Sequence, residues 1–407
     1  MLHIADLVAV GSLARRHGDL PAVVGHAAAS YPPESPGIAP VMAAAFEAAT
    51  AGHWLDWDDV LVTGAVHPGV VILPSLAAVS RIRPMTVLQA AEMFIVGVAR
   101  TQEVAAAFAP DHAARGWHPT ATIGRIAAAE VAAMHLDSGD RGMHWRAGRI
   151  AAGSASGFTD AFGSSLKPLQ VGAAAASAAS AAMLAASVTD VPDVLAPGSR
   201  LASLLGLNAP VTEPSPQISA VAIDAACAAL RVKQFPICFY AHPVILAAEQ
   251  LFAESSSSGA ISDLLIRVSP ECARTCDVTM PSTLDEVRFS LPTLVSALQR
   301  PSTDGLLGLL DGSILMTDSI TSSAAKIHLE VDSNCGPFMA EVDSGHSAVT
   351  VDLGAGTEID LEVTRSAVLR KAQLVGGEVG ISIERLALGD PEEATRPLSD
   401  VFDSPKE

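Results

Sequence analysis

The chain has 407 residues, enough for two domains with a large buried core, and 49% of them are hydrophobic while only 4% are aromatic. Apolar content of this kind, made mostly of Ala, Val, Leu and Ile, favours closely packed helices. The formal net charge of −19 argues against a nucleic-acid partner, because the chain has no basic patch to neutralise phosphates.

The compartment and the relation to membranes follow from cysteine use and from the uncharged stretches. Five cysteines and no recognisable signal peptide favour a reducing compartment, so we expect a cytoplasmic protein. Residues 171–189 are uncharged, but their Ala and Ser are too weakly apolar for lipid, which favours a buried core helix. Residues 60–80 contain Pro68 and Pro74, which would break a membrane-spanning helix. We expect no membrane partner.

The first half of the chain predicts helices. Thr86 and Gln89 form a capping box ahead of a periodic segment that stops at Pro110. Pro119 suits the first turn of another helix. Helices are expected over residues 88–108, 120–135, 146–157 and 167–187. A Pro-, Gly- and Ser-rich stretch near 191–218 interrupts the series.

The second half changes its pattern to alternating apolar and polar residues, which is typical of half-buried strands. We expect strands over residues 263–269, 326–332, 348–353 and 358–363, with the last two joined by a GAGT hairpin turn. Residues 283–299 predict one helix. The whole order suggests a mostly α fold with a smaller α+β domain. The predicted domains are a helical domain over 1–228, an α+β lid domain over 229–375, and a C-terminal segment over 376–407 that returns to the helical domain.

An acidic segment, HWLDWDDVLVTGAVHPG at 53–69, carries three carboxylates followed by a histidine. Asp56, Asp58 and Asp59 could bind a divalent cation, although the ligand spacing of a calcium loop is absent. One of them could instead cap a helix or turn while the others are solvated. The flanking tryptophans favour partial burial, in which a carboxylate can serve acid/base chemistry.

Three further residues stand in patterns that suit acid/base catalysis. His118, in GWHPTATIG at 116–124, precedes a Pro-initiated helix whose N-terminus attracts anions; the alternative is an ordinary buried histidine. Lys167 in GSSLKPLQVG and Lys233 in VKQFPICFYAHP lie among apolar residues. They either extend to solvent or form cations that stabilise a substrate carboxylate or an enolate. A lone CxxxC at Cys272 and Cys276 is weak evidence for a metal, and we expect no metal or cofactor.

These four motifs, together with LDEVRFSLPTLVSAL at 284–298, occur in an order that resembles the MmgE/PrpD family. The family includes 2-methylcitrate dehydratase, cis-aconitate decarboxylase and iminodisuccinate epimerase, and the resemblance runs from about residue 10 to 375. It implies a large helical domain, a smaller α+β lid domain, a homodimer, and chemistry without metal or organic cofactor.

The resemblance also implies the site residues. Its active-site positions are matched by Asp56, His67, His118, Lys167 and Lys233. Residues implied to contact the substrate are His53, Asp59, Gln170 and Thr293. The chain departs from the usual family pattern at three of its positions, with Val60 for Thr or Ser, Gln170 for His, and Thr293 for Tyr. Because these changes remove hydrogen-bond donors, we expect a substrate with fewer charges than methylcitrate.

The expected reaction labilises a bond beside a carboxylate of a small organic acid. His118 or Asp56 would move the proton, while Lys167 and Lys233 would stabilise the enolate-like intermediate. The leading interpretation is a cofactor-independent lyase, acting by dehydratase-type elimination or by decarboxylation. The alternatives are an epimerase or isomerase of a small dicarboxylate or imino acid, and a catalytically silent binding paralogue.

Overall fold

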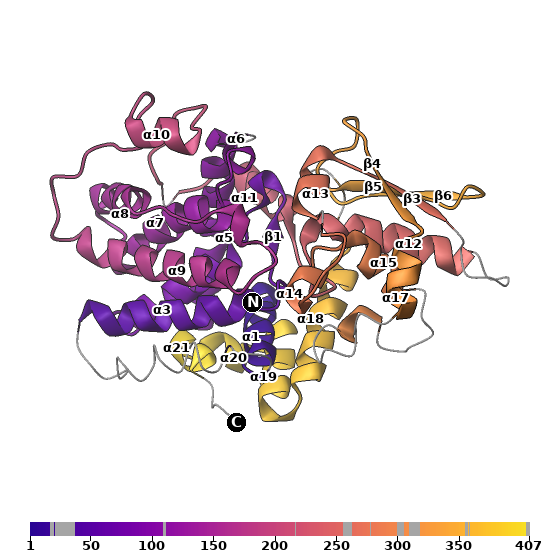
Figure 1. Cartoon of the computed structure of the whole chain (residues 1–407). Coiled ribbons are helices and arrows are strands. Elements are labelled where there is room, and N and C mark those ends of the chain that lie inside the picture. Colours follow the sequence, from indigo (N-terminus) through magenta and orange to yellow (C-terminus); the bar gives the residue numbers. More distant parts are fainter. Residues whose placement is uncertain are drawn as a thin grey trace.

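The structure is a computed structural model that describes residues 1–16, 20, 37–108, 111–215, 217–254, 263–276, 278–298, 305–308, 318–354, 357 and 359–403. A large helical part and a smaller part that combines helices with a sheet lie side by side (Figure 1). The predicted fold class, mostly α with a smaller α+β domain, is therefore confirmed. Within the described residues, no helix is both long and apolar enough to cross a membrane.

The helical part is built around α9 (Leu166–Leu184), an Ala-rich helix with a largely buried surface. Small side chains let its neighbours approach closely: a Cβ on Gly172 would lie 2.1 Å from the Thr50 hydroxyl of a neighbouring helix. The helices in contact with α9 are α3 (Ile38–His53), α4 (Gly69–Val79), α7 (Arg125–Leu136) and α8 (Arg141–Gly153). The uncharged stretch at 171–189 is thus mostly core helix, as predicted.

The predicted capping box starts α5 (Val87–Phe108). The Gln89 side chain accepts from the Thr86 backbone N–H at 2.9 Å, and the Thr86 hydroxyl accepts from the Gln89 N–H at 3.3 Å. Shorter elements of this part are η1 (Thr63–Ala65), α6 (Asp111–Ala114), η2 (Thr120–Gly124), η3 (Thr159–Ala161), α10 (Arg200–Leu205) and α11 (Ala220–Ala229). The element η2 is a π-helical turn that runs directly into α7.

The smaller part contains a four-stranded sheet in the order β4-β3-β5-β6. Its strands are β3 (Leu264–Val268), β4 (Ile327–Val331), β5 (Met339–Asp343) and β6 (Ala348–Asp352). The pair β3 and β4 is parallel, and the other two pairs are antiparallel. Packed with this sheet in one hydrophobic core are α12 (His242–Glu254) and α15 (Leu291–Leu298). Also in this part are η4 (Phe239–Ala241), α13 (Pro270–Thr275), α14 (Leu284–Val287), η5 (Gly305–Leu307) and α17 (Asp318–Ala324).

Two sequence predictions in this part are wrong. The hairpin partner of β6 is β5, and residues 361–363 of the strand expected at 358–363 belong to helix α18 (Leu361–Val375). Residue 358, and residues 355–356 of the expected GAGT turn, lie outside the described residues. The Asp360 carboxylate caps this helix by accepting from two backbone N–H groups, an interaction that alternation alone does not reveal. The single helix expected at 283–299 is two helices, α14 and α15, because the second starts afresh with Pro292 in its first turn.

The first helix of the chain packs against helices that come late in the sequence. Helix α1 (Leu2–Ala14) packs against α3, α18 and α19 (Gly377–Ala387), as Figure 1 shows. The last helices, α20 (Pro391–Thr395) and α21 (Leu398–Phe402), contact α5 and α4 of the helical part. The predicted division of the chain at 228 and 375 stays a prediction.

A two-residue strand pair joins the acidic segment to the motif that contains Lys233. Strand β1 (Val60–Leu61) pairs antiparallel with β2 (Leu230–Arg231). This pairing explains how Asp56 and Lys233, which are 177 positions apart in the sequence, reach the same site.

Candidate active site

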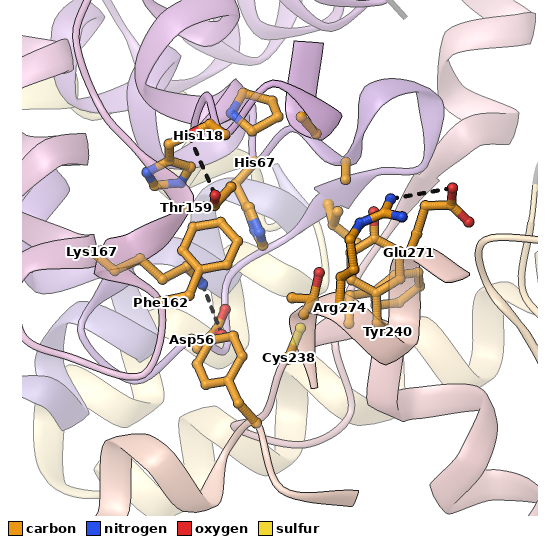
Figure 2. Close-up of a pocket in the computed structure, with 18 of the residues that line it drawn as sticks. Asp56, His67, His118, Thr159, Phe162, Lys167, Cys238, Tyr240, Glu271 and Arg274 are labelled. Carbon is orange, nitrogen blue, oxygen red and sulfur yellow. Dashed lines mark hydrogen bonds and ion pairs between the residues drawn. The ribbon is translucent and has the colours of Figure 1, made fainter. Parts of the chain in front are cut away.

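A cavity of about 440 Å³ lies where the helical part meets the α+β part (Figure 2). That size suits a small organic molecule. The helical part contributes Asp56, Val60, Ala65, His67, Ala113, Ala114, Gly116, His118, Pro119, Thr159, Asp160, Phe162 and Lys167. The other part contributes Cys238, Phe239, Tyr240, Glu271, Arg274, Thr275, Val278, Phe289 and Phe338.

Asp56 is bound by two ammonium groups. Lys167 Nζ lies 2.8 Å from Asp56 Oδ2, and Lys233 Nζ lies 2.5 Å from Oδ1. Lys233 also donates to the Asp56 backbone carbonyl at 2.9 Å and is completely buried. Burial would raise the pKa of Asp56, but the two lysines outweigh it and hold that pKa well below its ordinary value. Asp56 is therefore an ionised anchor for two cations and a poor proton acceptor.

The backbone at Asp56 is itself unusual. Its φ of 51° lies in the left-handed region, which non-glycine residues seldom adopt and Asp tolerates better than most. The Lys233 contacts to both the carbonyl and the side chain fix this conformation. Strained residues of this kind cluster at functional sites.

Lys167 lies between two aromatic rings at the cavity wall. Its ammonium is 5.2 Å from the centre of the Phe162 ring and 5.3 Å from that of Phe289. The ring faces favour the cation while excluding water from it. Lys167 thus presents a positive charge to the cavity from an apolar surround.

The hydrogen bonds of His118 determine its tautomer. Gln170 Oε1 accepts from the backbone N–H of Phe158 at 3.2 Å, and His118 Nδ1 lies 2.8 Å from the same oxygen. Since that oxygen can only accept, His118 Nδ1 must carry the proton. His118 Nε2 then holds the lone pair, and it has no hydrogen-bonding partner among the described residues.

The environment keeps His118 neutral. Burial, followed by the charges of His53 and Lys167, holds the pKa of His118 well below its ordinary value, although the Gln170 hydrogen bond raises it. A substrate carboxylate bound nearby would raise the pKa again, because it favours the imidazolium. His118 is thus a neutral imidazole whose basicity increases when an anion arrives.

Behind these groups lies a hydrogen-bonded array of His53, Asp58 and His67. Asp58 Oδ2 is 2.8 Å from His53 Nδ1 and 3.3 Å from His67 Nδ1. His67 Nδ1 also lies 2.7 Å from the Asp59 carbonyl, which can only accept, so Nδ1 carries a proton. Burial lowers the pKa of His53 to about 4. Burial would raise the pKa of Asp58, but the two histidines hold it well below its ordinary value.

Four side chains of this region are close enough to be considered as metal ligands. We name this set the His–Asp cluster: His53, Asp56, Asp58 and His67, whose ligand atoms lie within 4.8 Å of one another. The fit to a cation is poor, because Asp56 already binds two ammonium groups, which would repel an added divalent cation. The Nδ1 atoms of both histidines face Asp58 or the Asp59 carbonyl. The cluster is better described as a hydrogen-bonded acid/base array.

The structure brings eight of the nine site residues expected from sequence into one region, at two depths. Asp56, His67, His118 and Lys167 line the cavity, and Lys233, His53, Asp59 and Gln170 lie behind them. Asp59 orients a helix: its carboxylate accepts from the Gly69 N–H at the start of α4 at 2.9 Å and lies 2.9 Å from His3 Nδ1. A Cβ at Gly69 would lie 2.6 Å from that carboxylate, so glycine is required there. The ninth residue, Thr293, does not line the cavity; it is fully buried and accepts from the Ser290 hydroxyl at 2.8 Å.

Several cavity residues were not expected from the sequence. Tyr240 lines the cavity only seven residues after Lys233, in the same motif. Glu271 and Arg274 come from α13, within a segment considered only for its two cysteines. Phe162 and Phe289 were missed because an aromatic contact with Lys167 depends on tertiary packing alone.

Comparison with known proteins finds a family match for the N-terminal part of the chain. No curated protein matches the chain significantly. The family model described as the MmgE/PrpD N-terminal domain matches residues 2–195, which include Asp56, His67, His118 and Lys167. Members of this family are generally enzymes, with dehydratase- or lyase-type function. This match, over just under half of the chain, supports membership in the MmgE/PrpD family.

Proposed function

We propose that the protein is a cofactor-independent lyase that removes the proton beside a carboxylate of a small organic acid and then eliminates a β-hydroxyl group. The observation that carries the proposal is the neutral His118, whose Nε2 has no hydrogen-bonding partner among the described residues. His118 lines the same cavity as Lys167. A fixed base beside a cation is what abstraction of a weakly acidic α-proton requires.

Anion binding in a strongly acidic protein needs a local positive charge. Lys167 and Lys233 share one carboxylate, Asp56, so this ion-paired group carries one excess positive charge. The substrate carboxylate would bind Lys167, because Lys233 is completely buried and does not line the cavity. Lys233 keeps Asp56 partly neutralised, which leaves Lys167 available to the substrate.

The chemical steps use groups of this cavity. His118 Nε2 accepts the α-proton, and the C–H electron pair moves into the substrate carboxylate to give an enolate-like intermediate beside Lys167. The electron pair then forms the C=C bond as the Cβ–O bond breaks. The leaving hydroxide takes a proton from an acid and departs as water, giving an unsaturated acid.

Tyr240 is the acid that the cavity offers for the leaving group. The usual tyrosine position of the family is Thr293 here, but the Tyr240 phenol lines the cavity from another element. Burial raises the pKa of Tyr240, so its hydroxyl is protonated at neutral pH. The proton held by His118 returns to the phenol through solvent after each turnover, which restores both groups.

An epimerase is the second candidate, and His67 is the observation that favours it. Its Nδ1 is held by the Asp59 carbonyl, and its ring lines the same cavity as His118. Two imidazoles in one cavity could exchange a proton on opposite faces of one carbon.

Proton NMR in D2O with a panel of β-hydroxy di- and tricarboxylates and their amino and imino analogues distinguishes these functions. The proposal predicts a vinyl signal that is lost in Tyr240→Phe, with α-deuteration retained. Deuterium at the α-carbon without net conversion would instead establish the epimerase. Neither signal with any member of the panel would refute both.

A further inference from the structure

Three buried cysteines lie together at the wall of the cavity. Cys238 lines the cavity immediately before η4 (Figure 2). Cys272 lies on α13 and Cys276 caps its C-terminal end, and this helix contacts η4. All three are free thiols in one hydrophobic core, and none is more than 6% exposed. Since Thr275 and Val278 on either side of Cys276 line the cavity, Cys276 lies close behind the wall to which Cys238 contributes.

The three thiols interact with one another and differ in reactivity. Burial would raise the pKa of Cys238, but a hydrogen bond from Cys276 and the charges of two lysines, Lys167 and Lys233, outweigh burial and lower that pKa. Hydrogen bonds to Cys238 and Cys272, followed by burial, raise the pKa of Cys276 well above its ordinary value. Cys276 is therefore a protonated donor, and Cys238 is the sulfur with thiolate character, which is the reactive form.

We propose that Cys238 is an oxidation site for peroxides and that Cys276 resolves it by forming a Cys238–Cys276 disulfide. A small peroxide can reach Cys238 from the cavity, which the sulfurs of α13 do not line. The third thiol has another partner, because Cys272 Sγ donates to the Tyr240 carbonyl at 3.4 Å. Among the described residues the three sulfurs do not form a set of candidate metal ligands, which favours disulfide chemistry over metal binding.

The chemistry takes two steps. The Cys238 thiolate attacks one oxygen of hydrogen peroxide and the O–O bond breaks, giving a sulfenic acid; the released hydroxide takes up the proton that the thiol had lost and becomes water. The Cys276 sulfur then attacks the Cys238 sulfur, and the S–O bond breaks as the S–S bond forms. The leaving hydroxide takes the Cys276 proton and departs as water. The two thiols lose two electrons in all, and these reduce one peroxide to two waters.

Peroxide treatment of the full chain tests the proposal, with the exposed Cys227 and the partly exposed Cys335 replaced by serine. The protein is kept folded, as followed by circular dichroism, and remaining thiols are then alkylated. Mass spectrometry without alkylation should show a loss of about 2 Da, which dithiothreitol reverses, and peptide mapping should join Cys238 to Cys276. Adding Cys276→Ala should instead give a gain of about 16 Da that dimedone traps at Cys238. Cys272→Ala is the matched control and should still form the disulfide.

Several results would overturn the inference. Retention of all three buried thiols at a peroxide concentration that oxidises Cys227 in the wild type would remove the oxidation site. A bond mapped between Cys272 and Cys276, or a loss of about 2 Da that persists with Cys276→Ala, would show that the assigned pair is wrong. The peptide mapping changes no buried residue, so this test holds even if a buried variant fails to fold.

Discussion

Removal of Lys233 should damage both stability and catalysis, and Lys371 provides the matched comparison. Lys371 Nζ lies 2.5 Å from Asp6 Oδ1, and like Lys233 it is completely buried in a lysine–aspartate pair. Breaking a buried pair typically costs about 3–5 kcal/mol, because a buried charge loses its partner. Burial raises the pKa of Asp6, so Asp6 can take up a proton when Lys371 is lost. The loss in the free energy of unfolding caused by Lys371→Met should therefore be at the lower end of that range.

Catalysis should separate the two variants. In Lys233→Met, Asp56 keeps Lys167 as its one ammonium partner, so Lys167 is less available to a substrate carboxylate. Loss of a charged hydrogen bond of about 1.5–3 kcal/mol corresponds to a decrease in kcat/KM of roughly tenfold to hundredfold. The kcat/KM of Lys371→Met should remain within about fivefold of the wild-type value.

The assay combines urea unfolding followed by circular dichroism with kcat/KM for the substrate found in the NMR panel. Both variants are measured at a temperature where circular dichroism shows them folded. Comparable activity losses in the two variants would mean that stability alone accounts for the effect. Full activity in Lys233→Met would refute the claim that Asp56 and Lys233 determine how available Lys167 is to a substrate carboxylate.

Three further predictions concern protonation and metal. Gln170→Leu leaves the His118 Nδ1 proton without an acceptor, so kcat should fall by roughly fivefold to a hundredfold. Gln170→Glu should restore much of the lost kcat and move the acidic limb of the pH–rate profile to higher pH. An unchanged pH–rate profile in Gln170→Glu would show that Gln170 does not act on His118. Burial lowers the pKa of His53 and His112 to about 4 and that of His242 to about 3, so the unfolded chain binds protons below pH 6.5 that the folded chain does not. Calorimetry should show full stability above pH 6.5 and a falling Tm towards pH 4, and a constant Tm over this range would contradict these assignments. Treatment with EDTA followed by desalting should leave kcat and Tm unchanged, and loss restored by a divalent cation would show that the His–Asp cluster binds metal.

Local signals in the sequence predicted the helices better than the strands. The capping box at Thr86 and the Ala-rich run of α9 determine structure within one segment, so they could be identified without the fold. Strand β5 was missed, and residues 361–363 were assigned to a strand, because alternation does not reveal which partner a strand pairs with or where an aspartate caps a helix. Those features depend on tertiary contacts.

The sequence motifs predicted which residues belong to the candidate site, but not how those residues act on one another. The residue types and order of the motifs indicated Asp56, His118 and Lys167. The division of labour came only from the structure: two lysines on Asp56 make it a poor base, and Gln170 fixes the tautomer of His118. Arg274 could not be found from sequence, because an exposed arginine on a six-residue helix has no local feature that places it at a cavity.

The central claim is that the neutral His118 removes the α-proton, and the rate of α-proton exchange in D2O tests it most directly. The measurement compares the wild type with His118→Gln, and with His144→Gln as the control, a fully buried histidine of α8 outside the cavity. We predict that exchange is lost in His118→Gln, which stays folded, and is retained in His144→Gln. Exchange at the wild-type rate in folded His118→Gln would contradict the account and assign proton removal to another group.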